Sequence, residues 1–371
     1  MVGAKTWSPS FTRSEEDLRI AVCGLGKLGL PIAQAFGRSG VEVIGYDTDK
    51  KKLDTMDLLE FDTTTNPRIA ARESEACLFV VPTPSNPDGS FNHDILLGAI
   101  RSIAEHAPLD YLYIINSTVM PGFCDTLPYH VAYKPEFVAL GEVEYGLTHP
   151  DFLLIGAKHA SIHEDVRNLY RKITLFSTPV KLLSLLEAEI AKISLNCAIT
   201  AKISFANQVG MLADRLGANA EHILDVVGSD HRIGHACLKA GLPFGGPCFP
   251  RDNSMFRYVA GESGTSSAMC EATDKINGTV VEEIIRKVPK DGSVGILGMA
   301  YKVGTGVTEE SAGTKLAKLL RELGRTVFTD DPTYVVREIE RALECPTVII
   351  ACPWPEYAGL RFSKGTKVIA P

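Results

Sequence analysis

A cysteine with charged neighbours lies in a segment that has no helix or strand periodicity. Cys248 stands among glycines and prolines in residues 245–252, with Arg251 and Asp252 shortly after it. Cationic groups favour the thiolate, which is the nucleophilic form of cysteine. The segment therefore indicates a candidate nucleophile, and a purely structural cysteine is the alternative that local features leave open.

Metal binding is a second alternative for this cysteine. His231, His235 and Cys237 offer imidazole and thiolate groups ahead of Cys248. However, neither CxxC nor HExxH spacing occurs here, and zinc sites usually show such regular spacing. We therefore expect no metal site.

A lysine and an asparagine share one face of a long predicted helix. Lys192 and Asn196 are four residues apart, which is about one helical turn, and Asn207 lies farther along roughly the same side. Such residues usually form a solvated face. We interpret them as candidate functional residues here because the chain also carries the loop cysteine and a glycine turn.

The glycine turn has the form G-x-G-x-x-G, with Gly24, Gly26 and Gly29. It follows an apolar strand at 18–23 and opens a helix, so its glycines suit a tight turn and a close approach to a pyrophosphate. Asp47 ends the next strand, where a carboxylate accepts ribose hydroxyls and repels a 2′-phosphate. The pattern predicts NAD rather than NADP; the alternatives are a turn without a ligand and a phosphate bound by the lysines at 50–52.

The elements around these residues predict an α/β protein. Strand-like runs alternate with helical stretches, then a long helix runs from about 186 to 216, and further strands follow after about 290. We expect two Rossmann-like doubly wound parallel-sheet domains joined by a helical central domain. The expected ranges are 18–182 for the NAD-binding domain, 183–290 for the central or dimerisation domain and 291–371 for a short C-terminal domain. The strand-like runs are 18–23, 41–46, 77–81, 111–116, 152–155, 293–297, 326–329, 347–351 and 367–369.

Composition excludes several classes of protein. The chain has 371 residues, 45% of them hydrophobic, and a formal charge of -7, so neither disorder nor nucleic-acid binding is expected. No apolar run approaches the ~18–20 residues of a membrane span. The cysteine count of nine is odd and lacks regular spacing, which favours a reducing compartment such as the cytoplasm. Residues 1–17 are polar and read as a loose tail rather than a signal peptide.

Taken together, the motifs resemble those of the UDP-glucose/GDP-mannose dehydrogenase family, the nucleotide-sugar 6-dehydrogenases. The resemblance runs from about residue 19 to about residue 357. Its motifs are GLGKLGLP at 24–31, VPTP at 81–84, STVMPG at 117–122, KPEF at 134–137, Glu189 with Lys192 and Asn196, DHRIG at 230–234, FGGPCFPRD at 244–252 and ILGMAYK at 296–302.

The resemblance implies an oxidoreductase that oxidises a sugar primary alcohol twice, to a uronic acid of the kind used in polysaccharide biosynthesis, with two NAD. Cys248 matches the nucleophile that forms a thiohemiacetal and then a thioester. Lys192 matches the lysine that stabilises the oxyanion, and Asn196 matches its partner. Asp252 matches a carboxylate implicated in proton transfer with that lysine.

Further matches concern water, cofactor and hydrolysis. Glu136 matches the candidate general base for thioester hydrolysis and a substrate contact. Thr118 matches a hydroxyl that holds the catalytic water beside the cofactor, and Thr83 matches a cofactor contact. Lys27 and Leu28 belong to the glycine turn and are expected at the cofactor.

Substrate contacts are implied at three more positions. Gly245 lies in the cysteine loop, and Lys302 matches a substrate-contacting lysine of the last domain. Arg232 matches an arginine that reaches the sugar nucleotide of a neighbouring subunit, which implies a homodimer or higher oligomer. UDP-glucose is the first expectation for the substrate, with UDP-N-acetylhexosamine, GDP-mannose and other sugar nucleotides open.

The chain departs from the family pattern at three places. Leu140 stands where a second glutamate is usual, and Val307 and Glu309 stand where an aspartate and an arginine are usual. The sequence also stops at Pro371, shortly after the last predicted strand, which would leave the nucleotide pocket more open or completed in another way.

Two other functions stay in view. A single-step hydroxyacid-type dehydrogenase also pairs a lysine with an asparagine one helical turn apart, but it needs no cysteine. A catalytically weakened relative that binds a sugar nucleotide as a regulatory protein would fit the departures. Two NADH per sugar indicate the two-step enzyme, one indicates the single-step enzyme, and none indicates the regulatory protein.

Overall fold

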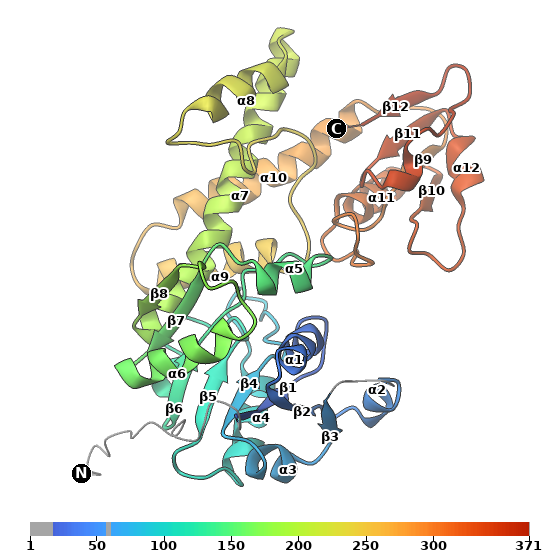
Figure 1. Cartoon of the computed structure of the whole chain (residues 1–371). Helices are drawn as coiled ribbons and strands as arrows, with labels where there is room; N and C mark the ends of the chain where they lie inside the picture. The colour runs from blue at the N-terminus through green and yellow to red at the C-terminus, as the bar shows by residue number, and fades with distance from the viewer. Residues whose placement is uncertain (1–17, 57–60, 371) are drawn as a thin grey trace. The chain divides into compact units, whose positions relative to one another are not determined.

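The computed structural model describes residues 18–56 and 61–370 (Figure 1). The expected tail at 1–17 lies outside the described residues. The chain divides into two compact units, one up to Lys192 and the other from Ile193 onward. Each is described by itself below.

The first unit is built on one eight-stranded sheet with the order β3-β2-β1-β4-β5-β6-β7-β8. Pairing is parallel from β3 to β6, β7 runs antiparallel to β6, and β8 is parallel to β7. The order 3-2-1-4-5-6 is that of dinucleotide-binding sheets, which bind their ligand where the strand order reverses. The strands are β1 Arg19–Cys23, β2 Glu42–Tyr46, β3 Asp62–Thr64, β4 Ala76–Phe79, β5 Leu112–Ile115, β6 His130–Tyr133, β7 Leu153–Ala157 and β8 Val180–Leu183.

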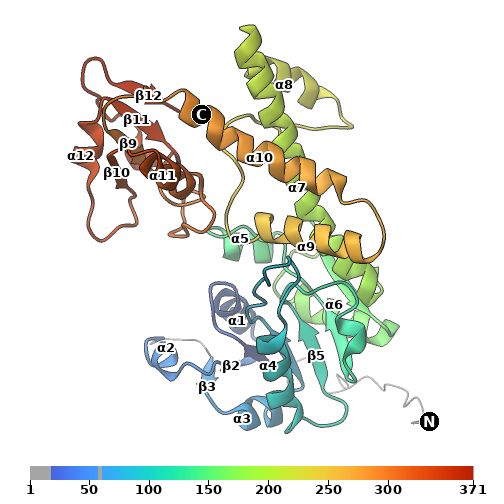
Figure 2. The ribbon, with the colours of Figure 1, turned by 180° about the vertical axis from the view of Figure 1, so that it is seen from behind.

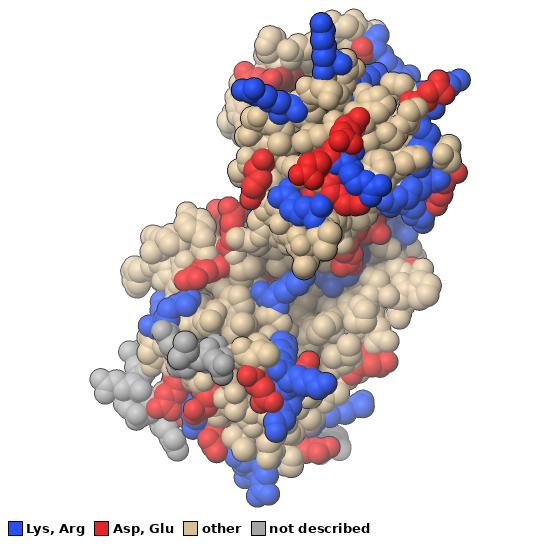
Figure 3. Space-filling model, turned by 90° about the vertical axis from the view of Figure 1, so that its right-hand side faces the viewer, with Lys and Arg blue, Asp and Glu red and all other residues tan. Residues whose placement is uncertain are grey.

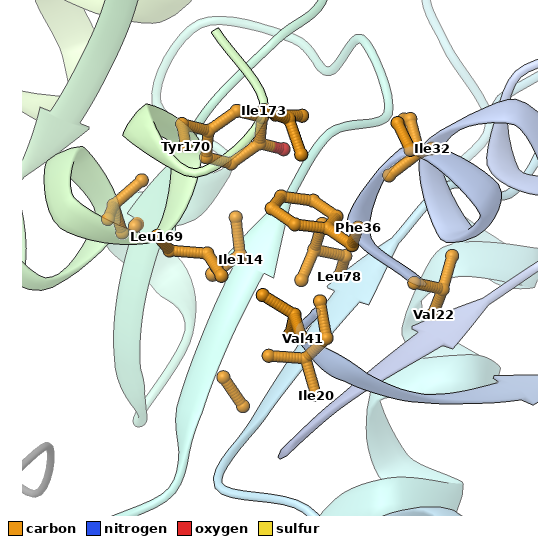
Figure 4. Packing of buried hydrophobic residues seen from close by; sticks show 14 of the residues in the cluster. Ile20, Val22, Ile32, Phe36, Val41, Leu78, Ile114, Leu169, Tyr170 and Ile173 are labelled. Carbon is orange, nitrogen blue, oxygen red and sulfur yellow. The ribbon is translucent and has the colours of Figure 1, made fainter. Parts of the chain in front are cut away.

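Alternation along β1 divides the core of this unit into two layers. Ile20 and Val22 belong to one buried cluster, whereas Ala21 and Cys23 belong to the other, because successive side chains of a strand point to opposite faces. Helices α1 (Gly29–Arg38) and α6 (Ala160–Arg171) cover the first face, and Phe36 meets Tyr170 there edge to face (Figure 4). Helices α3 (Pro67–Arg72) and α4 (Asp94–Ala104) cover the second. Two short helices complete the unit, α2 (Lys50–Asp54) and α5 (Val143–Thr148).

A 32-residue helix, α7 (Leu185–Leu216), begins in the first unit and continues into the second. It is followed by α8 (Ala220–Ser229), α9 (Phe249–Glu262) and α10 (Ala268–Arg286) (Figure 2). A four-stranded parallel sheet of order β10-β9-β11-β12 comes next, with α10 and α11 packed on one face. Its elements are β9 Val294–Leu297, α11 Ala312–Glu322, β10 Val327–Asp330, α12 Ile339–Leu343, β11 Thr347–Ile350 and β12 Lys367–Ile369.

The predicted α/β architecture is confirmed, and every strand expected from the sequence is present to within two residues at either end. The prediction missed β3, β6 and β8, and it did not anticipate the antiparallel direction of β7 and β8. Strands β3 and β8 are the edge strands of the sheet and are largely exposed, so their sequences lack the apolar run of a central strand. The division into three domains at 182 and 290 stays a prediction.

Charge is mixed on the molecular surface. On the face in Figure 3, basic and acidic side chains are interspersed, and neither sign covers the face alone. No helix in the described part of the chain combines the length and the hydropathy that a membrane span requires.

Candidate active site

The glycine turn after β1 forms a cradle that side chains would fill. Gly24 has φ +93°, and a Cβ at Gly29 would lie 1.8 Å from the carbonyl oxygen of Gly24. At Gly26 a Cβ would meet nothing within 4 Å, so the exposed backbone there is open to a ligand at the start of α1. Lys27 is exposed and Leu28 is the N-cap residue of that helix. A pyrophosphate fits this arrangement because the first amide groups of a helix are unpaired and carry positive partial charge.

Asp47 follows β2 beside the glycine turn. Its Oδ2 accepts a 2.9 Å hydrogen bond from the amide of Leu25, and the same oxygen lies 2.6 Å from Lys52 Nζ. Burial raises the pKa of the Asp47 carboxyl, but hydrogen bonds from Lys52 and from the amides of Asp49 and Leu25 outweigh burial and leave the pKa below its ordinary value. The carboxylate is therefore ionised at neutral pH. Asp47 and the glycines fit the ribose and pyrophosphate of NAD.

The ends of β4 and β5 carry the predicted threonines. The Thr83 hydroxyl donates a 2.7 Å hydrogen bond to the carbonyl oxygen of Thr118. Ser117 holds the same two loops together, because its hydroxyl donates to the Val81 carbonyl and accepts from the Val81 amide. Because β1, β4 and β5 are parallel, the loops after β4 and β5 lie at the same edge of the sheet as the glycine turn after β1.

A buried carboxylate fixes the loop that follows Thr118. Glu189 on α7 has no exposed surface, and its two oxygens accept hydrogen bonds from the amides of Gly122 and Cys124 at 2.5 and 2.8 Å. Burial raises the pKa of Glu189, and the two amide donors only partly offset it. The loop is thus attached to the helix that carries Lys192, one turn away.

Glu136 lies in a buried polar network beyond β6. Its Oε2 is 2.5 Å from Lys134 Nζ, and its Oε1 is 3.1 Å from the amide nitrogen of Asn116. The same amide nitrogen is 2.7 Å from the Tyr170 hydroxyl, and Lys134 Nζ lies over the Tyr170 ring at 3.9 Å from its centre. Lys192 joins from α7, because its ammonium group donates to the Glu136 carbonyl oxygen at 2.8 Å. Glu136 and Lys192, which are 56 residues apart in the sequence and belong to separate motifs, therefore lie together.

In the second unit, Cys248 is the N-cap residue of α9 and is exposed. The positive end of a helix favours a thiolate at this position. Four residues later, Asp252 has no exposed surface, and its Oδ2 accepts a 2.6 Å hydrogen bond from Asn196 Nδ2. Arg251 lies 3.4 Å from the other oxygen of Asp252. The predicted residues Asn196, Asp252 and Cys248 are thus brought together by α7 and α9.

The loop before Cys248 packs closely against the loop after β9. A Cβ at Gly245 would lie 2.1 Å from the carbonyl oxygen of Glu310, and a Cβ at Gly246 would lie 2.6 Å from the Tyr301 ring. Lys302 follows Tyr301 in that second loop and is half-buried. Glycine is therefore required at both positions by the packing itself.

Arg232 lies elsewhere in this unit, in the loop after α8. Its guanidinium group is exposed and pairs with Asp230 at 2.6 Å. The contact that we expect between Arg232 and the sugar nucleotide of a neighbouring subunit stays a prediction.

The three departures from the family pattern have different surroundings. Leu140 is half-buried in the loop after Glu136. Val307 accepts a backbone hydrogen bond from Tyr301, whereas Glu309 is exposed. The effect of Leu140, Val307 and Glu309 on activity can be measured by substitution. Pro371 lies outside the described residues.

The sequence analysis missed several residues of these clusters. Lys134 and Glu189 stand in the family motifs without an implied role, and Asn116 and Tyr170 belong to no predicted site. Lys52 was placed beyond the end of the strand, but its ammonium group contacts Asp47. The sequence signal that could have revealed the cluster around Glu136 is the lysine two residues before it, Lys134. Among the described residues, no three His, Cys, Asp or Glu side chains are grouped as a metal site would require.

Two family models match the chain. One is the NAD-binding domain of the UDP-glucose/GDP-mannose dehydrogenase family, over residues 57–174, and the other is the central domain of the same family, over residues 186–279. Together they span more than half of the chain. This chain belongs to the UDP-glucose/GDP-mannose dehydrogenase family. The dehydrogenase is therefore an NAD-dependent oxidoreductase that acts on a CH–OH group.

Known relatives cover nearly the whole dehydrogenase. UDP-glucose 6-dehydrogenase of Rickettsia bellii is 27% identical over 86% of this chain and 81% of that protein. The structure of a UDP-glucose dehydrogenase from Pyrobaculum islandicum has a TM-score of 0.87 and 27% identity, and covers 96% of this chain and 97% of that one. That of a UDP-D-ManNAc dehydrogenase from Pyrococcus horikoshii has a TM-score of 0.83 at 24% identity, over 95% and 93%, and shows the common fold.

Proposed function

We propose that this dehydrogenase oxidises the C6 primary alcohol of a nucleotide sugar to a carboxylate in two steps, through a thioester on Cys248. The observation that supports it most is the exposed thiol at the start of α9, one helical turn from the buried Asn196–Asp252 pair. A single oxidation needs no cysteine at this place.

The proposed reaction consists of two oxidations and one hydrolysis. The alcohol carbon loses a hydride and its hydroxyl loses a proton, which gives an aldehyde. The Cys248 thiolate adds to the aldehyde carbon and the oxygen takes a proton, which forms a thiohemiacetal. Loss of a second hydride and of that proton gives the thioester. Water then adds and the C–S bond breaks, so the carboxylate and a proton are released and the Cys248 thiol is regenerated. NAD, when bound, would supply the hydride acceptor for each oxidation.

The residues of the two units take separate roles in the proposal. Lys192 stabilises the negative charge that develops on the substrate oxygen, with Asn196 as second donor. Asp252 exchanges the proton of that oxygen, Glu136 removes a proton from the attacking water, and Thr118 orients that water. The network around Glu136 supports its part, because both carboxylate oxygens are held by hydrogen bonds.

For the substrate we propose UDP-glucose first, with Gly245, Lys302 and a neighbouring subunit's Arg232 as contacts in a homodimer or higher oligomer. The named relatives include enzymes for UDP-glucose and for UDP-D-ManNAc, so the sugar must be tested directly. A thermal-shift panel of sugar nucleotides is suitable, because a ligand that binds only the folded state raises the melting temperature. We place the enzyme in the cytoplasm because all nine cysteines are free thiols.

The number of NADH formed per sugar consumed tests the proposal. Two NADH and a carboxylate product support it. One NADH and a released aldehyde support a single-step dehydrogenase instead, and binding without NADH supports a regulatory protein.

A further inference from the structure

We propose that Lys134 is a positioning residue that orients the Glu136 carboxylate for thioester hydrolysis. This inference rests on the proposed role of Glu136 as the base in that step. Neither the sequence motifs nor the family resemblance gave Lys134 a role.

The geometry of the pair supports a functional link. Lys134 Nζ lies 2.5 Å from Glu136 Oε2, and the two side chains are 4% and 5% exposed. Two charges this deeply buried cost solvation free energy, which their mutual attraction recovers only with good geometry. A lysine in contact with solvent could stabilise the fold without this cost in solvation free energy.

The surroundings of Lys134 fix its direction. Its ammonium group lies 3.9 Å from the centre of the Tyr170 ring, and that ring packs edge to face on Phe36 at 5.4 Å in the core (Figure 4). Asn116 holds the other carboxylate oxygen of Glu136. The Tyr170 hydroxyl accepts from the same Asn116 amide and also hydrogen-bonds to Glu136. These partners fix the orientation of the carboxylate, and so the direction in which it can accept a proton from water.

The Lys134 ammonium group contacts the Glu136 carboxylate directly. Lys192 donates to the Glu136 backbone carbonyl oxygen, and its charge contributes to lowering the pKa of Lys134. Burial raises the pKa of the Tyr170 hydroxyl, which is therefore neutral. Burial lowers the pKa of Lys134, and the Glu136 carboxylate opposes this change, so the two charges depend on each other.

The test neutralises Lys134 in the full-length enzyme. In Lys134→Met the Glu136 carboxylate loses the ammonium group that holds its Oε2, so hydrolysis of the thioester should slow. We expect a hydrolysis rate lower by about tenfold or more, and an accumulation of the acyl adduct on Cys248 in intact-protein mass spectrometry. The burst of NADH that precedes hydrolysis should keep its rate. Lys134→Arg keeps the charged donor and should restore hydrolysis, and Lys181→Met, at an exposed lysine of β8, is the matched control.

Lys134→Gln is a second neutral variant, and whichever of the two neutral variants folds is measured. Adduct hydrolysis at the wild-type rate in a folded neutral variant would overturn the inference. Glu136→Gln separates this failure from that of the proposed function. If Glu136→Gln hydrolyses the adduct at the wild-type rate, then the role of Glu136 is wrong; if it is defective while the neutral Lys134 variant is normal, only the role of Lys134 is wrong.

Discussion

Asn196 Nδ2 donates a 2.6 Å hydrogen bond to Asp252 Oδ2, and this contact fixes α9 against α7 at the turn that follows Cys248. A second contact, one turn farther along α7, joins the Thr200 hydroxyl to Oδ1 of Asn253, the residue after Asp252, at 2.9 Å. The two bonds set the register of the helix that begins with the proposed nucleophile. Catalytic groups need such positioning to within about an ångström.

The first prediction concerns this pair. Asn196→Ala removes the 2.6 Å donor of the buried Asp252 side chain, so the free energy of unfolding should fall by about 1–3 kcal/mol. Denaturant titration measures the change. Asn168→Ala, at an exposed position of α6, is the control and should have little effect. Equal stability of the two variants would show that the Asn196–Asp252 bond contributes nothing.

The second prediction concerns Glu189, whose oxygens accept from two backbone amides. In Glu189→Gln one acceptor becomes an NH₂ group that faces an N–H donor. We expect a loss of about 1–3 kcal/mol of unfolding free energy, with weaker substrate turnover because the Thr118 loop is released. Glu282→Gln, on an exposed face of α10, is the control. Unchanged stability in Glu189→Gln would contradict the anchoring role of this carboxylate.

The third prediction concerns cofactor choice. The Asp47 carboxylate should make the enzyme prefer NAD, because it repels a 2′-phosphate. In Asp47→Asn that repulsion is lost and Lys52 is released from its 2.6 Å contact. The ratio of kcat/KM for NAD to that for NADP should fall by about tenfold or more, which corresponds to about 1.4 kcal/mol. Adding Lys52→Met to Asp47→Asn should lower kcat/KM for NADP again, because the cation that could contact the 2′-phosphate is removed. A ratio that does not respond to Asp47→Asn would rule out its role in selection.

The fourth prediction is a pH dependence. Burial lowers the pKa of His93 to about 4, and the neutral ring accepts a hydrogen bond from the Met120 amide at 3.3 Å. Because the folded pKa lies below the ordinary value, the contribution of neutral His93 is present above about pH 6.5 and is lost as the pH falls toward 4.

The measurement is the free energy of unfolding at pH 7 and pH 5, for the wild type and for His93→Gln. The wild type should lose more stability than the variant over this range, by roughly 1–2 kcal/mol. His222→Gln, on the exposed surface of α8, should follow the wild type. If His93→Gln loses as much stability as the wild type, then His93 does not cause the dependence.

Local sequence predicts the parts of the fold that have a local cause. Strands β1, β4 and β5 are buried on both faces, so their sequences are continuous apolar runs. The strand β3 has the sequence DTT and lies at the sheet edge, where burial imposes no pattern. Only tertiary pairing reveals such a strand.

The same contrast holds in the site. The glycine turn is predictable because its spacing follows from backbone geometry within six residues. The partners of Glu136 are not, because Asn116 and Tyr170 are 54 residues apart and meet only in the folded sheet. The role of Lys134 is not predictable from sequence for another reason: lysine is rarely buried unless it is paired, and the pair is a property of the fold.

The count of NADH per nucleotide sugar in Cys248→Ala tests the central claim most directly. The wild type should form two NADH and a carboxylate. Cys248→Ala should lose the second oxidation because no sulfur is present to form the thioester, while sugar nucleotide and NAD still bind. Cys237→Ala removes the other exposed cysteine and should keep two NADH per sugar. If Cys248→Ala still forms two NADH and a carboxylate at close to the wild-type rate, then the thiol is structural and the two-step mechanism through a thioester is wrong.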